Sequence, residues 1–236
     1  MNREQVLLNR GGEDVMGVPI SEATSLKYYG AERRDMLVYV PHHAKRVLGL
    51  GCGVGNLGKL IKQRQSAEVW GVELIPSVAA LARLSLDRVI EGDIMQVMRD
   101  LPSGLFDCIV ANDVLEHLIH PDQALQDIRR CISPGGFVIA SIPHIRHWKA
   151  LFEILILADF QYRDSGTFDR THLRFFTKKS ICRLFGDAGY QVERIEGNTP
   201  SGPAALVPLI LLNVLLLGKI SDWRYAGFAV VARLVS

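Results

Sequence analysis

The sequence has few cysteines and little net charge. Its 236 residues include four cysteines, which lie far apart and form no C-x-x-C pair. This spacing argues against a disulfide framework or a zinc site and is typical of free thiols in a reducing compartment. The net charge is only +2, so the composition gives no basic footprint for nucleic acid. We therefore expect no nucleic-acid partner.

Long apolar runs are also missing. Residues 1–17 contain no continuous apolar core, so we expect no secretory signal and a cytoplasmic protein. The most apolar stretch, AALVPLILLNVLLLG at 204–218, is shorter than the roughly 20 residues that a spanning helix needs. Pro208 suits the first turn of a shorter helix and Gly218 suits its end. We expect this helix to pack within the protein or a dimer, with peripheral docking on a membrane as the alternative.

Short β-rich runs alternate with helical patterns along most of the chain. Such alternation indicates parallel β-α-β units. The expected fold class is therefore α/β, with an open, mostly parallel seven-stranded sheet and helices on both faces. Strands are expected at 46–50, 67–73, 88–93, 106–113, 135–143, 190–197 and 225–235.

The domain organisation follows from the position of the first strand. Residues 1–45 are expected to form an N-terminal arm and helix, and 46–236 the main domain. An insert at about 144–176 is rich in aromatic residues, and we expect it to act as a lid over a substrate. Its arginines could grip a carboxylate or phosphate, or could pair with nearby aspartates and only shape the lid; they are Arg146, Arg163, Arg170 and Arg174.

The stretch VLGLGCGVGNLG, at 47–58, is rich in glycine and directly follows the first expected strand. Glycine permits positive φ and lets a ligand approach the backbone. A tight turn alone would need only one or two glycines, so we expect a ligand-binding loop at the sheet edge where the parallel strands end. Its glycines are Gly49, Gly51, Gly53, Gly55 and Gly58.

Two acidic residues follow the next two strands. Glu73 ends the second strand, where a carboxylate can accept hydrogen bonds from both hydroxyls of a ribose. Asp93 follows the third strand and would suit an adenine amino group. These residues fit any ribose-containing cofactor. The literal G-x-G-x-x-G pattern from Gly53 to Gly58 keeps a nicotinamide-dependent oxidoreductase open as an alternative.

Five motifs occur together, in the order VLGLGCGVG, GVEL, EGDI, FDCIVANDVLEHL and ISPGGFVIASIP. With them, over about 47–143, the chain resembles the class I S-adenosylmethionine-dependent methyltransferases of the seven-stranded α/β type. The flanking stretches YYGAERRDMLVYVP and DRTHLRFFTKKSICRLFGDAGY look like bacterial small-molecule and polysaccharide-associated methyltransferases. The resemblance implies a Rossmann-like methyltransferase fold, S-adenosyl-L-methionine as cofactor, and methyl transfer to a small-molecule acceptor, with oxygen as the expected acceptor atom.

The resemblance also implies roles for individual residues. The glycine loop and Cys52 would lie against the amino-acid end of the cofactor, and Asn112 would contact its methionine end. Glu73 would hold the ribose and Leu74 would pack on the adenine. Asp93 would bind the adenine amino group, with Ile94 beside it. The expected cofactor-binding set is Gly49, Gly51, Cys52, Gly53, Gly55, Glu73, Leu74, Asp93, Ile94 and Asn112.

Gly49 departs from the family pattern, which usually has an acidic residue at that position. We expect another group, from the N-terminal arm, to take its place. Together with the apolar stretch at 204–218, this departure keeps a third hypothesis open, a non-catalytic cofactor-binding or membrane-docked module.

Histidines provide the candidate catalytic groups. An oxygen or amine acceptor must lose a proton, and a positioned histidine commonly accepts it. His172, in DRTHLRFF, and His117, in VLEH, are the candidate bases, with a structural hydrogen bond as the alternative for each. His117 with His120, and His144 with His147, have H-x-x-H spacing, and the neighbouring Glu116 could add a carboxylate ligand. This spacing is common by chance, so we expect no required metal.

Overall fold

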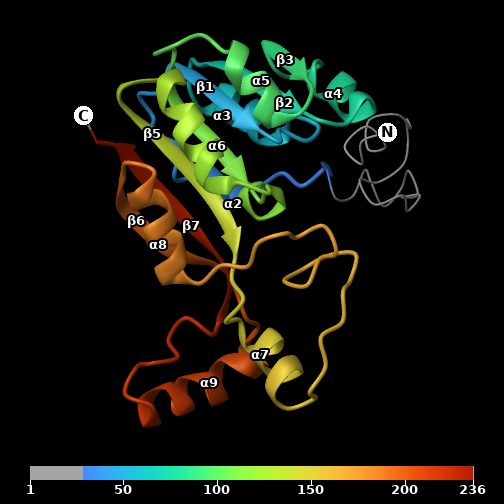
Figure 1. The fold of residues 1–236 in the computed structure, drawn as a ribbon, viewed down its shortest axis with the longest axis vertical. Coiled ribbons are helices and arrows are strands. Elements are labelled where there is room, and N and C mark those ends of the chain that lie inside the picture. The colour runs from blue at the N-terminus through green and yellow to red at the C-terminus, as the bar shows by residue number, and fades with distance from the viewer. Residues whose placement is uncertain (1–28, 236) are drawn as a thin grey trace, which may run out of the picture.

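One seven-stranded sheet organises the structure, in the strand order β3-β2-β1-β4-β5-β7-β6 (Figure 1). The structure is a computed structural model that describes residues 29–235, apart from the side chains of 203–206, so most of the expected N-terminal arm lies outside the described residues. All seven expected strands are confirmed, with ends that differ by a few residues. They are β1 (Arg46–Leu50), β2 (Glu68–Glu73), β3 (Arg88–Glu91), β4 (Phe106–Asn112), β5 (Ile132–Pro143), β6 (Tyr190–Pro200) and β7 (Tyr225–Leu234).

The strand directions place the glycine loop at a shared edge. β1 pairs in parallel with β2 and β4, β2 with β3, and β4 with β5. Only β7 runs antiparallel, to both β5 and β6. The carboxyl ends of β1 to β5 therefore meet at one edge of the sheet, where ligands of open α/β sheets bind.

Helices cover both faces of the sheet, as expected. In β4, Ile109 belongs to one buried core and Cys108 to another. Leu125 and Ile181 pack into the first core, and Ile61 into the second. Strands buried on both faces read as continuous apolar runs, which is the pattern of the sequence. The α-helices are α2 (Arg34–Leu37), α3 (Asn56–Arg64), α4 (Pro76–Ala82), α5 (Ile94–Val97), α6 (Pro121–Ile128), α7 (Trp148–Leu155), α8 (Lys178–Asp187) and α9 (Pro203–Leu215), and the 3-10 turns are η2 (Met98–Asp100), η3 (Leu115–His117) and η4 (Arg129–Cys131).

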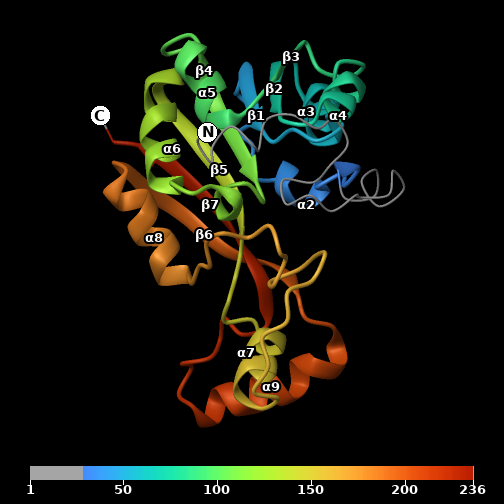
Figure 2. The same ribbon diagram turned by 45° about the vertical axis from the view of Figure 1, so that its right-hand side comes forward.

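The helices α7 and α9 lie together at one end of the molecule, beyond the carboxyl end of β5 (Figures 1 and 2). The Nε1 of Trp148 donates to Ser201 Oγ at 2.9 Å, just before α9. Arg146 pairs with Asp222 at 2.8 Å, just after it. These contacts join the start of α7 to both ends of the segment that carries α9.

Helix α9 differs from the expectation at its start and in its surroundings. It begins with Pro203 in its first turn, so Pro208 lies inside the helix rather than at its beginning. Gly218 has φ 80° and its N–H donates to the carbonyl of Asn213 at 2.8 Å, which confirms the expected stop. Packing within the protein's own core is wrong, because most side chains of 207–217 are exposed. Within the part described, no helix has the length and apolarity needed to cross a membrane.

Candidate active site

Three glycines of the loop adopt the left-handed backbone that the sequence predicts. Gly51, Gly53 and Gly55 have φ values of 59°, 54° and 84°. A Cβ at Gly53 would lie 2.6 Å from the carbonyl oxygen of Tyr29, which accepts a hydrogen bond from Val54 N at 3.3 Å. The loop is therefore closely covered by the N-terminal segment at Tyr29.

The other two glycines serve different purposes. Gly49 lies in β1 with an ordinary φ, and a Cβ there would make only van der Waals contact, 3.4 Å from the Cβ of Cys52. Gly58 lies in α3, and a Cβ there would come 2.3 Å from the side chain of Leu86. The last glycine of the literal G-x-G-x-x-G pattern thus permits close packing of α3 and needs no ligand to explain it.

Glu73 lies against the glycine loop, as its proposed role requires. Its carboxylate is buried and accepts hydrogen bonds from Gly53 N at 2.9 Å and Ile75 N at 3.1 Å. Burial raises the pKa of Glu73, and the backbone donors oppose that rise. Because a carboxylate can accept about four hydrogen bonds, each oxygen retains capacity for a ribose hydroxyl.

Asp93 lies at the same edge of the sheet. Its Oδ1 caps α5 by accepting from Met95 N at 2.7 Å and Gln96 N at 3.3 Å. Neither capping bond uses Oδ2, which could accept from an amino group. Gly92 N also donates to the carbonyl of Glu73 at 3.0 Å, which ties the two strand ends together. Leu74 is exposed beside them, as a residue that packs on an adenine would be, and Ile94 is half-buried against the core.

Cys52 and Asn112 are placed differently from each other. The thiol of Cys52 points toward β2, where a Cβ at Gly71 would lie 2.5 Å from its Sγ. Only the backbone of Cys52 is therefore available to a ligand at the loop. Asn112 ends β4, and its Oδ1 is buried with no hydrogen-bond partner among the described residues. A buried amide oxygen needs a donor, and an ammonium group at the methionine end of a cofactor would supply one.

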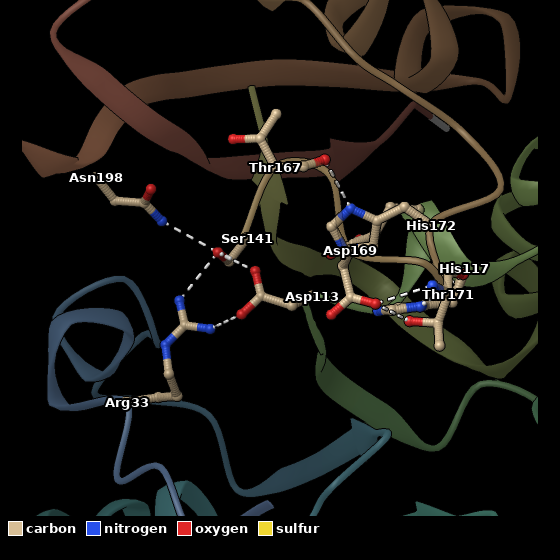
Figure 3. Close-up of polar contacts among 10 residues, drawn as sticks. Arg33, Asp113, His117, Ser141, Thr167, Asp169, Thr171, His172 and Asn198 are labelled. Carbon is tan, nitrogen blue, oxygen red and sulfur yellow. Dashed lines mark hydrogen bonds and ion pairs between the residues drawn. The ribbon is translucent and has the colours of Figure 1, made fainter. Parts of the chain in front are cut away.

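A polar network beside Asn112 was not predicted from the sequence (Figure 3). Arg33 forms an ion pair with Asp113, and its Nη2 donates to Ser141 Oγ at 2.9 Å. The same hydroxyl donates to Asp113 Oδ1 at 2.9 Å and accepts from Asn198 Nδ2 at 3.0 Å. Arg33 and Asp113 both have left-handed backbones, with φ values of 49° and 53°. The described part of the N-terminal segment thus contributes a cation near Asp113, and a replacement from the arm for the acid missing at Gly49 stays a prediction.

Both predicted catalytic histidines belong to one cluster (Figure 3). The rings of His117 and His172 are 4.9 Å apart, and His172 is brought there by the insert. His117 Nδ1 lies 3.1 Å from the carbonyl oxygen of Thr171, and His172 Nδ1 lies 3.2 Å from that of Thr167. Because a carbonyl oxygen only accepts, both Nδ1 atoms donate, and each neutral ring keeps its lone pair on Nε2.

Glu116 completes this cluster, and its carboxylate is fully buried. Within the part of the chain that the structure describes, neither carboxylate oxygen has a hydrogen-bond partner; His172 Nε2 lies 3.9 Å from Oε1. Burial, with Asp113 nearby, raises the pKa of Glu116 well above its ordinary value. Burial, with the neighbouring His172, lowers the pKa of His117 and keeps its ring neutral near pH 7.

The cluster of Glu116, His117 and His172 could bind a proton or a metal ion. One ligand atom from each residue lies within 4.8 Å of the others. The backbone carbonyl hydrogen-bonded to each Nδ1 fixes the orientation of the ring. Nε2 is then the nitrogen available to a metal ion, as is common around metal sites. The expectation that no metal is required stays a prediction.

Comparison with known proteins decides between the alternative cofactors. A family model described as a methyltransferase domain matches residues 26–195. The chain belongs to the class I S-adenosylmethionine-dependent methyltransferases. This membership identifies the methyltransferase as an enzyme that uses S-adenosylmethionine, and it favours this function over the nicotinamide-dependent and non-catalytic alternatives.

Curated relatives match the methyltransferase over about two thirds of their length. The ubiquinone biosynthesis O-methyltransferase of Aeromonas salmonicida is 29% identical over 160 residues, covering 65% of this chain and 66% of the relative. The protein of the same name from Pseudomonas paraeruginosa is 32% identical over 162 residues, covering 66% and 68%.

Solved structures confirm the fold of the methyltransferase. A SAM-dependent methyltransferase from Archaeoglobus fulgidus aligns with a TM-score of 0.70 at 18% identity, over 89% of this chain and 98% of that one. One from Mesorhizobium loti aligns with a TM-score of 0.60 at 19% identity, over 86% and 98%.

Among the described residues, His120, His144 and His147 are not members of the cluster. His120 is exposed at the start of α6. His144 is buried against the ring of Phe228 at 4.8 Å, and His147 contacts Ser201 Oγ at 3.2 Å.

The arginines of the insert are engaged in the methyltransferase's own contacts. Arg163 pairs with Glu153 and Arg170 with Asp164, each at 2.7 Å. Arg174 donates to the carbonyl of Ile119 at 2.6 Å. These contacts favour the alternative in which the arginines shape the insert. That the insert closes over the acceptor stays a prediction.

Proposed function

We propose that this methyltransferase methylates a hydroxyl oxygen on the ring of an apolar small molecule. The observation that carries the proposal is the Glu116–His117–His172 cluster, where an unpartnered buried carboxylate faces two histidines with free Nε2 atoms. A ring hydroxyl loses its proton when it is methylated, and such a group can accept that proton. The relatives named ubiquinone biosynthesis O-methyltransferases support oxygen as the acceptor atom.

The residues that would hold S-adenosylmethionine surround the glycine loop. Glu73 would bind the ribose hydroxyls and Asp93 the adenine amino group. Asn112 would accept from the ammonium group of the methionine end, and Arg33 would attract its carboxylate. When bound, S-adenosylmethionine supplies an electrophilic methyl group; the protein aligns the acceptor oxygen with it and excludes water.

The histidines would remove the acceptor proton. A neutral imidazole accepts the proton at Nε2 while its Nδ1–H stays bonded to a backbone carbonyl, so the ring need not turn. The carboxylate of Glu116, 3.9 Å from His172 Nε2, would stabilise the imidazolium that forms. We propose His172 as the base and His117 as its alternative.

A divalent cation is a second candidate occupant of the same cluster. Glu116, His117 and His172 would be its ligands, and it would lower the pKa of an acceptor hydroxyl. Activity that survives dialysis against EDTA would exclude a required metal, whereas activity restored only by added Mg²⁺, Mn²⁺ or Zn²⁺ would favour it.

The test is His172→Ala, with His120→Ala as a matched control because His120 is exposed and outside the cluster. Purified enzyme is incubated with S-adenosylmethionine and a panel of phenols and catechols with and without apolar tails, and methylated products are measured by mass spectrometry. We expect His172→Ala to reduce kcat about 10²-fold or more and His120→Ala to leave it unchanged. Unchanged turnover in His172→Ala would remove His172 as the base.

We also propose a cytoplasmic protein that associates peripherally with a membrane. An acceptor with an apolar tail would be found there, and the exposed helix α9 supports the contact.

A further inference from the structure

An apolar surface covers the end of the molecule that carries α7 and α9. We define it as the apolar end, formed by residues 207–217 and 154–157. On the α9 side, Leu211, Leu215 and Leu217 are 67%, 76% and 86% exposed. An exposed patch of this kind on a folded protein marks an interaction site.

Helix α9 has one polar residue, Asn213. Its Oδ1 accepts a hydrogen bond from Ile220 N at 3.1 Å, in the turn that follows the helix. The other side chains between 207 and 217 are all apolar.

Residues at the end of α7 and just after it are also apolar and exposed. Leu155, Ile156 and Leu157 are 67%, 68% and 60% exposed. Both views place α7 and α9 at the same end of the molecule (Figures 1 and 2). Two segments from distant parts of the chain thus expose their apolar residues together.

The charges near the apolar end favour an anionic partner. Two acids beside the apolar end are paired. Glu153 pairs with Arg163 at 2.7 Å, and Asp222 pairs with Arg146 at 2.8 Å. Among residues 29–235, no ion pair joins Lys149 or Lys219 to an acid, and Lys149 is exposed at the start of α7 and Lys219 just after α9. Asp159, close to the apolar end in the sequence, has no ion pair with any residue of 29–235.

We propose that the apolar end docks on an anionic lipid bilayer, with the exposed leucines of α9 among the acyl chains. Because α9 has no polar face that would hold one side at headgroup level, its side chains would be buried below the headgroups, and Lys149 and Lys219 would meet the anionic headgroups. A second copy is the weaker occupant, because a two-fold interface would bury only one stripe of a helix that is apolar on all sides.

The apolar end lies on the side of the sheet toward which β5 runs, the side that also carries the candidate active site (Figures 1 and 2). The end of β5 leads directly into α7, and the insert then returns to His172. The link to an apolar acceptor rests on the proposed function. Docking itself does not, because it is measured without cofactor or acceptor.

The experiment is flotation of the full chain with vesicles of phosphatidylcholine alone or with phosphatidylglycerol. The test variant is Leu211→Glu with Leu215→Glu. The matched control is Leu84→Glu, because Leu84 is 82% exposed just after α4, outside the apolar end. Calorimetry with S-adenosylmethionine checks that each variant is folded, and light scattering reports the oligomeric state.

We expect the wild type and Leu84→Glu to float with anionic vesicles and the double variant to partition at least about tenfold less. Lys219→Gln should weaken partition into anionic vesicles about fivefold and leave partition into phosphatidylcholine unchanged. A wild type that does not float, or a double variant that floats equally well, would overturn the proposal. So would a dimer in solution that the double variant converts to monomer without any binding to vesicles, since the occupant would then be a second copy.

Discussion

Two buried glutamates, one on each side of the candidate site, differ in how their charge is held. Glu73, on the cofactor side, receives two backbone N–H groups from the loop and from the start of α4. Glu116, on the acceptor side, receives no hydrogen bond from any described residue. The fold itself stabilises the first carboxylate, whereas the second depends on a proton, a protonated histidine or a bound cation.

This difference separates binding from chemistry. A carboxylate held by the backbone is a fixed acceptor and suits a cofactor that is bound in every turnover. A buried carboxylate without partners can change its charge during the reaction, because little in the protein opposes protonation. Substitutions on the two sides should therefore have different signatures.

The largest expected effect is on turnover at Glu116. Glu116→Gln keeps the shape but removes the charge that would stabilise a protonated histidine, so kcat should fall about 10²–10³-fold with little change in affinity for S-adenosylmethionine. The measurement pairs initial rates with calorimetry of cofactor binding. Equal losses in kcat and in affinity for S-adenosylmethionine would show that Glu116 contributes to cofactor binding, as Glu73 does, and would contradict the distinction between the two glutamates.

Glu73 should show the opposite signature. Glu73→Ala removes the acceptor of Gly53 N and of the ribose hydroxyls, which should weaken S-adenosylmethionine binding by about 1–3 kcal/mol. Glu91→Ala, at the paired position of β3, is the control because Glu91 is exposed. Isothermal calorimetry that finds equal affinities for the two variants would remove Glu73 from the cofactor site.

The glycine loop allows a test within one segment. Gly53→Ala forces an L-residue to φ 54° and places a Cβ 2.6 Å from the carbonyl oxygen of Tyr29, so unfolding free energy should fall by about 1–3 kcal/mol. Gly49→Ala, with an ordinary φ and room for a Cβ, should change it by less than about 1 kcal/mol. Urea denaturation of both variants measures the difference, and equal values would contradict the assigned backbone.

The smallest expected effect concerns the pH dependence of stability. The pKa of Glu116 is raised in the folded state. Its contribution to the free energy of unfolding is therefore fully present below about pH 4.3 and is lost as pH rises through the folded pKa. Glu116→Gln should therefore gain stability relative to wild type as pH rises from 5 to 8.

His117 acts in the other direction. The pKa of His117 is lowered in the folded state. Its contribution to the free energy of unfolding is therefore present above about pH 6.5 and is lost as pH falls through the folded pKa. Denaturation of Glu116→Gln and His117→Gln at pH 5 and pH 8 separates the two groups. A Glu116→Gln advantage that is the same at both pH values would contradict the raised pKa.

Patterns that are local in the sequence predicted most of the fold and the cofactor side. Apolar runs and turn residues located all seven strands, and spacing from the glycine loop located Glu73. His117 and His172 were found as separate candidates, but nothing in the sequence indicated that Glu116 lies unpartnered between them. That meeting depends on how the insert returns to η3, which residue patterns do not encode.

Two features lay beyond sequence patterns for different reasons. Arg33 and Asn198 reach Ser141 from segments far apart in the chain, and although Arg33 lies in the stretch YYGAERRDMLVYVP, nothing in that stretch indicates its partner. The apolar run of α9 predicted burial, because apolarity reports a preference for leaving water and does not say what covers the helix.

The carbonyl group of Glu116 anchors the chemistry independently of the side chain. It accepts hydrogen bonds from Leu173 N at 2.8 Å and Arg174 N at 3.0 Å, the two residues after His172. Because this anchor is main chain, replacing the buried Glu116 side chain by one of similar size leaves the returning histidine held in place. The acidity of the group beside the histidines can therefore change while the backbone that positions them stays the same.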